Sequence, residues 1–169
     1  MKKFFLFVLV ALLAVAAYYF FPESTLPEGK AVDRLEVLKG EKQMMAYSGE
    51  ELLKTYSIAT GKQITDDFGD VIERLPVGSY IIIDKDARSR FYKHLAFVPA
   101  EKVVIEDGKP RKAKSVSALW IHGMKRRYGF IGKFHRWFEW TKGGVAITDD
   151  EMDDLFGKVD VGAKVNVNL

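Results

Sequence analysis

The stretch WTKGGVAIT, at positions 140–148, decides how the rest of this sequence is interpreted. Its apolar residues 145–147 predict a short strand, and Gly143 and Gly144 stand directly before it. Upstream, the apolar run 116–121 predicts a buried strand that ends at His122. These two strand ends mark a candidate site in a chain of 169 residues that contains no cysteine.

The N-terminal segment, residues 1–21, differs from the rest of the chain. Lys2 and Lys3 are followed by residues 4–21, which are apolar and uncharged, as in an export signal. The run is long enough to cross a bilayer, which takes roughly 17–25 apolar residues. We favour an uncleaved inner-membrane anchor through residues 4–21 over a cleaved signal peptide. Either alternative places the body outside the cytoplasm, in the periplasm or secreted, because Lys2 and Lys3 favour the cytoplasmic side.

The charge distribution limits the classes of partner. Without Lys2 and Lys3, the 26 basic residues become 24, against 23 acidic ones. This near balance argues against a nucleic-acid-binding protein, whose binding domain is strongly basic. Basic residues at positions 125–127, 133 and 136 nevertheless follow His122, so an anionic ligand near this histidine is one hypothesis. A solvated basic face is the alternative.

The body is predicted to be mainly β with short helices. Residues 34–38, 43–47 and 52–60 predict an antiparallel meander joined by tight turns. Further strands are expected at 79–83, 91–98, 116–121, 145–147 and 165–167, with a loop at 61–75 and a short amphipathic helix or lid within 125–140. Thr148 and Glu151 form the pattern of a capping box, so a helix should begin there and end at Gly157. The expected organisation is an anchor or signal at 1–21, a linker that acts as a tether at 22–33, and one domain at 34–169.

Several motifs, in order, resemble the L,D-transpeptidase catalytic domain of the YkuD type. They are YSIATG at 56–61, Gly69-Asp70 followed by RLPVGSY at 74–80, IHG at 121–123, and TKGG at 141–144. This chain departs from the family pattern in several places. It has Leu75 for the usual threonine, Lys142 for a histidine, Gly144 for the cysteine and Ala146 for a polar residue, and the spacing between His122 and Thr141 is slightly longer.

The resemblance implies a β-sandwich or barrel domain that acts on peptidoglycan stem peptides. In the family, a cysteine thiolate attacks a stem-peptide carbonyl and an amine resolves the acyl-enzyme. Carried over, His122 is the base, Gly123 orients it, and Gly144 occupies the nucleophile position without a side chain. Thr141 and Gly143 are loop and oxyanion residues. The candidate substrate-binding residues are Thr141, Lys142, Gly143, Arg127 and Trp140.

Two classes of function remain open, so the sequence alone does not decide whether the protein is an enzyme. The first is a non-catalytic relative that binds stem peptides or a cell-wall partner, such as another enzyme or a lipoprotein. The second is an active enzyme, either a transpeptidase in which Gly144 is an engineered replacement or a hydrolase whose water is activated by His122. A structural envelope protein is a third, weaker alternative.

We expect no cofactor and no metal, since the three histidines lack cysteines or a carboxylate at metal spacing. His94 is expected to be structural, and His135 to pack or cap unless the aromatic segment folds over the site.

Overall fold

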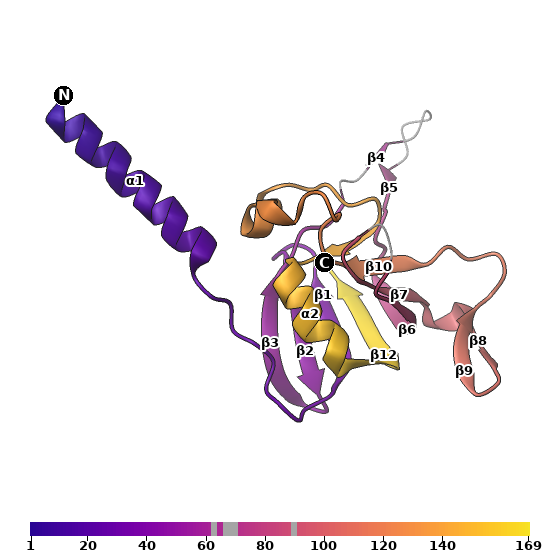
Figure 1. Ribbon diagram of the computed structural model, residues 1–169. Coiled ribbons are helices and arrows are strands. Elements are labelled where there is room, and N and C mark those ends of the chain that lie inside the picture. The colour runs from indigo at the N-terminus through magenta and orange to yellow at the C-terminus, as the bar shows by residue number, and fades with distance from the viewer. Residues whose placement is uncertain (62–63, 66–70, 89–90) are drawn as a thin grey trace.

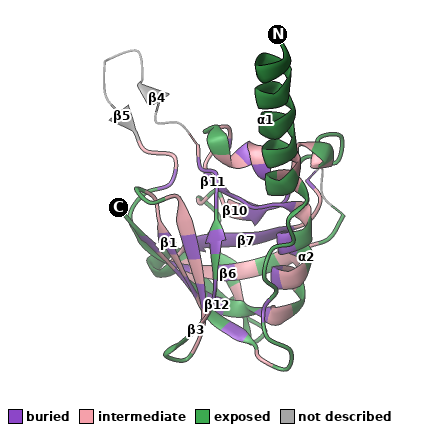
Figure 2. Cartoon of the chain, turned by 90° about the vertical axis from the view of Figure 1, so that its left-hand side faces the viewer, coloured by how far each residue is buried: buried purple, intermediate pink, exposed green. Residues whose placement is uncertain are grey.

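The N-terminal helix stands apart from a β-rich body in the computed structural model, which describes residues 1–61, 64–65, 71–88 and 91–169. Helix α1 (Lys2–Phe20) has 19 residues, and none of them is buried (Figure 2). Its hydropathy of 2.2 and its length allow it to cross a membrane.

Three strands form the predicted meander. They are β1 (Val32–Leu38), β2 (Gln43–Ser48) and β3 (Glu51–Ser57), and each pairs antiparallel with the next. Alternate residues of β1, Leu35 and Val37, are buried, as the period of two for a half-buried strand requires. The meander was therefore predicted correctly within two or three residues at each end.

The remaining strands extend this meander into a mixed eight-stranded sheet. They are β6 (Gly78–Asp86), β7 (His94–Pro99), β10 (Leu119–His122), β11 (Gly144–Ala146) and β12 (Val159–Asn168). The strand order is β11-β10-β7-β6-β12-β1-β2-β3, with β12 parallel to β1 and β11 parallel to β10. The last strand of the chain therefore lies in the middle of the sheet (Figure 1).

The two edges of the sheet meet beyond the end of β3. Ala59 forms an antiparallel bridge to Ala146 of β11, with N–H to O distances of 2.9 and 2.8 Å. The sheet thus curls toward a barrel around a core that includes Tyr56, Phe97 and Ile121. The closure brings residues after β3 next to the strand that carries Gly144.

Helix α2 (Asp149–Lys158) starts with the predicted capping box. The Thr148 hydroxyl accepts a hydrogen bond from the Glu151 N–H, and the Glu151 carboxylate accepts one from the Thr148 N–H. Met152 and Leu155 are buried in the core. The helix runs one residue past Gly157, where its end was expected.

Other expectations need correction. The loop expected at 61–75 contains a two-stranded hairpin, β4 (Ile64–Thr65) with β5 (Val71–Ile72), while Gly69-Asp70 lies outside the described residues. A short 3-10 turn, η1 (Ala100–Lys102), precedes a hairpin of β8 (Val103–Glu106) and β9 (Lys109–Lys112). The expected helix within 125–140 is instead the 3-10 segment η2 (Gly129–Trp137), because Gly132 (φ 50°, ψ −132°) breaks it in two.

The segment between α1 and the body is exposed at residues 21–25 and enters the core at Leu26. We call residues 21–26 the strap. Leu26 at its end is 2% exposed, and its N–H donates to Asp154 Oδ2 at 2.7 Å, while Lys158 Nζ donates to the Leu26 carbonyl at 2.7 Å. The strap is therefore attached to α2 at its Leu26 end.

Candidate functional site

His122 lies buried at the end of β10 with its ring orientation fixed. Its Nδ1 is 2.7 Å from the carbonyl oxygen of Gly123, which can only accept, so Nδ1 carries the proton of the neutral ring. The lone pair is then on Nε2, the arrangement that a general base requires. The rings of Phe91 and Trp140 pack around the imidazole, at centroid distances of 4.2 and 5.5 Å.

Gly144 begins β11 and is the register partner of Trp120 in β10. A Cβ at this position would lie 2.3 Å from the Trp120 carbonyl oxygen, much closer than any real contact. The main chain of β10 thus occupies the place where the side chain of a nucleophile would start. Glycine at position 144 is therefore required by packing as well as lacking a reactive atom.

The turn before β11, at residues 141–143, is closely packed against neighbouring main chain. Gly143 has φ +104°, and a Cβ there would lie 2.8 Å from the Arg74 carbonyl oxygen, so only glycine fits without strain. The buried hydroxyl of Thr141 donates to the Gly144 carbonyl at 2.9 Å. This hydrogen bond engages the Thr141 hydroxyl within the turn, which makes Thr141 a poor nucleophile.

An aromatic cavity of about 420 Å³ lies next to His122. It lies between the loop after β10 and the segment η2, and Trp140 links it to the His122 ring. We call it the aromatic cavity, and its lining residues are Met124, Lys125, Tyr128, Ile131, His135, Phe138 and Trp140.

Three buried polar atoms of the aromatic cavity's lining residues lack a hydrogen-bond partner among the described residues. They are both ring nitrogens of His135 and Nε1 of Trp140. Burial lowers the pKa of His135 to about 4, helped by the positive charge of Arg136 and by His122, so the ring is neutral at pH 7. Buried polar groups normally have partners. These three atoms are themselves shielded from solvent, so the His135 and Trp140 rings must turn before a ligand or water in the cavity can reach them.

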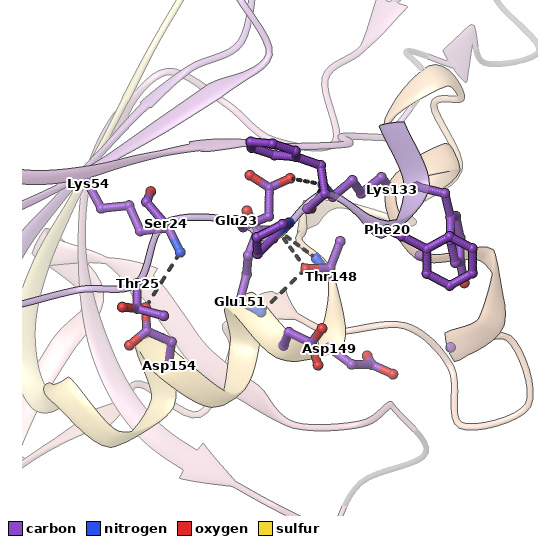
Figure 3. Close-up of a pocket in the computed structure, with 16 residues that line it drawn as sticks. Phe20, Glu23, Ser24, Thr25, Lys54, Lys133, Thr148, Asp149, Glu151 and Asp154 are labelled. Atoms are coloured by element: carbon purple, nitrogen blue, oxygen red, sulfur yellow. Dashed lines mark hydrogen bonds and ion pairs between the residues drawn. The ribbon is translucent and has the colours of Figure 1, made fainter. Parts of the chain in front are cut away.

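A second cavity, of about 460 Å³, lies between the strap and α2 (Figure 3). Here the charged groups pair with each other. Glu23 binds Lys133 at 3.1 Å and Arg136 at 2.9 Å, and Arg136 also binds Glu151 at 2.9 Å. Burial alone would raise the pKa of Glu23, but hydrogen bonds and charges from Arg136 and Lys133 outweigh it and lower the pKa. Since Lys133 Nζ also donates to the Phe21 carbonyl, this network attaches the strap to η2.

The structure brings together some of the candidate residues and separates others. His122, Gly123 and Gly144 lie on or beside the paired strands β10 and β11, and Trp140 contacts His122. Arg127 and Lys142 are exposed and do not line the aromatic cavity. His94 packs structurally, stacked on Trp120 at 4.5 Å.

His135 is packed, as expected: it is 2% exposed and its ring lies edge-on to Trp140 at a centroid distance of 6.3 Å. Within the described ranges, no group of three His, Cys, Asp or Glu residues is placed to hold a metal ion.

The YkuD family model, the L,D-transpeptidase catalytic domain, matches residues 33–167. The chain belongs to this family. No curated protein matches significantly. The likeness to solved structures supports the same fold and the mainly β class predicted from the sequence.

Three L,D-transpeptidase structures illustrate the likeness. Those from Enterococcus faecium and Mycobacterium smegmatis both have a TM-score of 0.51, at 17% and 12% identity, and each match covers 82% of this chain. The Xylanimonas cellulosilytica structure has a TM-score of 0.50 at 14% identity and covers 90% of this chain. The matches cover 50%, 59% and 68% of those three chains respectively, so this YkuD protein corresponds to only part of each.

Proposed function

We propose that this protein is a non-catalytic L,D-transpeptidase relative, anchored in the inner membrane and facing the periplasm, that binds peptidoglycan stem peptides. The observation that carries the proposal is the packing of Gly144 against the Trp120 carbonyl, 2.3 Å from where a Cβ would lie. A site in which only the cysteine side chain had been lost would keep space for that side chain beside position 144. Here that space is filled, while the orientation of His122 is kept.

The aromatic cavity supports a binding role. Its volume of about 420 Å³ is in the usual range for ligand sites, roughly 300–1,000 Å³. The apolar walls can contact the methyl groups of a short peptide. Its amide and carboxylate groups can bond to the His135 nitrogens and the Trp140 N–H once these buried rings turn toward the cavity. A cell-wall enzyme or a lipoprotein is the alternative partner at the same site.

Binding can be tested with the full chain in detergent micelles, titrated with a disaccharide-tetrapeptide muropeptide and followed by calorimetry. We expect saturable binding that weakens at least tenfold in His135→Phe, which keeps the ring volume but removes both nitrogens. Ile105→Ala, on the distant β8–β9 hairpin, is the control and should bind like the parent chain. If neither the muropeptide nor the free stem peptide binds, stem-peptide recognition is excluded.

Hydrolysis by water is a second candidate, favoured by the Nε2 lone pair of His122. In this reaction, His122 takes a proton from water as its oxygen attacks a peptide carbonyl, and the departing amine then receives that proton. Mass spectrometry of muropeptides incubated with the full chain distinguishes the two functions. We expect no new product. A trimmed product that disappears in His122→Ala would overturn the non-catalytic proposal.

A further inference from the structure

We propose that the segment η2 and the residues flanking it form a membrane-docking surface that lies in the headgroup region of an anionic bilayer. The surface, here called the aromatic face, consists of Tyr128, Phe130, Trp137 and Phe138. Phe130 is 73% exposed, Trp137 61% and Phe138 64%. Such a cluster of large apolar groups on a small body marks an interaction site.

The length of α1 indicates how deep in the bilayer the aromatic face lies. A 19-residue helix is about 28 Å long at about 1.5 Å per residue, close to the roughly 30 Å hydrocarbon thickness. When α1 spans the bilayer, its last turn therefore lies at the membrane–water boundary. Tyr18 and Tyr19 are in that turn, where aromatic residues are enriched in membrane helices.

Direct contacts hold η2 at the same depth. The Tyr19 ring stacks on Phe134 at 5.4 Å, the Tyr18 ring stacks on Trp137 at 6.0 Å, and the Tyr19 hydroxyl donates to the Phe130 carbonyl at 2.6 Å. Figure 2 shows α1 rising from this part of the body, so η2 lies at the foot of the helix. A segment stacked on the last turn of α1 must lie where that turn lies.

Bonds between the strap and η2 restrain the orientation of the body relative to α1. Glu23 bonds to both Lys133 and Arg136 of η2, and Lys133 also bonds to the Phe21 carbonyl. These bonds join the end of α1, the strap and η2 within a few residues. The orientation of the aromatic face toward the membrane is therefore built into the fold.

The charge beside this surface indicates the kind of lipid. Lys125, Arg126 and Arg127 are consecutive and exposed, directly before Tyr128. Basic residues close to a membrane surface are attracted to anionic lipid headgroups. An aromatic face flanked by basic residues therefore fits the headgroup region of a membrane containing anionic phospholipid.

Spin labels can test the depth directly, because the chain has no native cysteine. The full chain carrying Phe130→Cys or Phe138→Cys is labelled and reconstituted in nanodiscs containing anionic phospholipid. Collision with oxygen, which concentrates in the bilayer, is compared with collision with a water-soluble nickel complex. Ile105→Cys, on the exposed β8–β9 hairpin, is the aqueous control.

We expect labels at 130 and 138 to collide preferentially with oxygen and the label at 105 with nickel. Nickel accessibility at 130 equal to that at 105 would overturn the proposal. So would exclusion of both reagents together with dipolar broadening, which would indicate that a second copy covers the face.

A charge-reversed chain, Arg126→Glu with Arg127→Glu, tests the headgroup part of the proposal. We expect at least a twofold rise in nickel accessibility at position 130 in anionic discs and no change in zwitterionic ones. An unchanged value in anionic discs would overturn the role of these arginines. Muropeptide titration of the Phe130→Cys chain with both arginines intact separates this outcome from failure of the proposed binding function, because Arg127 is a candidate substrate-binding residue and Phe130 does not line the aromatic cavity.

Discussion

Replacing Gly144 by cysteine restores the residue type that the family uses, but the new Cβ would meet the Trp120 carbonyl at 2.3 Å. Forcing atoms into a packed interior typically costs about 1–3 kcal/mol. We therefore expect Gly144→Cys to lower the free energy of unfolding by that amount, measured by urea denaturation, and to remain unacylated by a carbapenem in intact-mass spectra.

A glycine in open space provides the matched control. A Cβ at Gly157 in α2 meets no atom within 4 Å, so Gly157→Ala should stabilise the protein by roughly 0.5–1 kcal/mol. A Gly144→Cys chain that is as stable as the parent and becomes acylated would show that β10 moves easily, and that only the sulfur is missing.

His135 should make stability depend on pH. Its pKa is about 4 in the folded protein against 6.5 for a free side chain, so the unfolded chain binds more protons between these values. Stability is then full above pH 6.5 and falls as the pH drops toward 4, by at most about 3 kcal/mol. Urea denaturation at pH 7.5 and 4.5 should show a smaller difference in His135→Gln than in the parent chain.

Acid sensitivity below about pH 4.5 should survive in that variant. The pKa of Glu23 is lowered, so its protonation at low pH also removes stabilising ion pairs with Arg136 and Lys133. An unchanged pH dependence in His135→Gln would mean that His135 is protonated in the folded state and would contradict its neutral role in the aromatic cavity.

At the scale of elements, the capping box of α2 gives a separate prediction. Thr148→Ala removes the oxygen that accepts from the Glu151 N–H, and the loss of such a cap costs about 0.5–2 kcal/mol. Hydrogen exchange should show faster opening of the first turn of α2. Thr148→Ser keeps the oxygen and should preserve protection, whereas equal exchange in both variants would show that packing alone holds the helix.

Local patterns predicted elements better than they predicted contacts. The alternation in β1 and the capping box of α2 are contained within a few consecutive residues, and both were located closely. The bridge from Ala59 to Ala146 joins residues far apart in the chain, so no local pattern could reveal it. The 3-10 form of η2 depends on Gly132 and its contact with α1, which helical spacing alone could not show.

In the candidate site, too, the residues within a local motif were predicted and the contacts between distant residues were not. The IHG motif indicated His122 and Gly123 through the resemblance, and the missing cysteine at 144 could be seen in the sequence. The clash with Trp120 could not, because it depends on the parallel register of β10 and β11. The aromatic cavity was also hidden, since it exists only after the chain from Met124 to Trp140 folds beside His122.

At the scale of the whole molecule, the strap should contribute to the stability of the body. Leu26 is 2% exposed and part of the core, so Leu26→Ala should cost about 2–5 kcal/mol in urea denaturation. Limited proteolysis should also cut residues 21–31 faster. Leu52→Ala, on the exposed side of β3, is the control and should change stability by less than about 0.5 kcal/mol. Equal effects of both substitutions would show that the strap is not part of the folded core.

The place of β12 in the sheet also sets the order in which this protein can fold. Strands β11, β10, β7 and β6 lie on one side of it and β1, β2 and β3 on the other, so the sheet is complete only when the last eleven residues are available. Domains generally begin to fold during synthesis as their parts emerge. This body must instead wait for β12, which joins the two halves of its sheet. If the chain is exported, as we propose, that delay keeps the sheet incomplete until β12 has crossed the membrane.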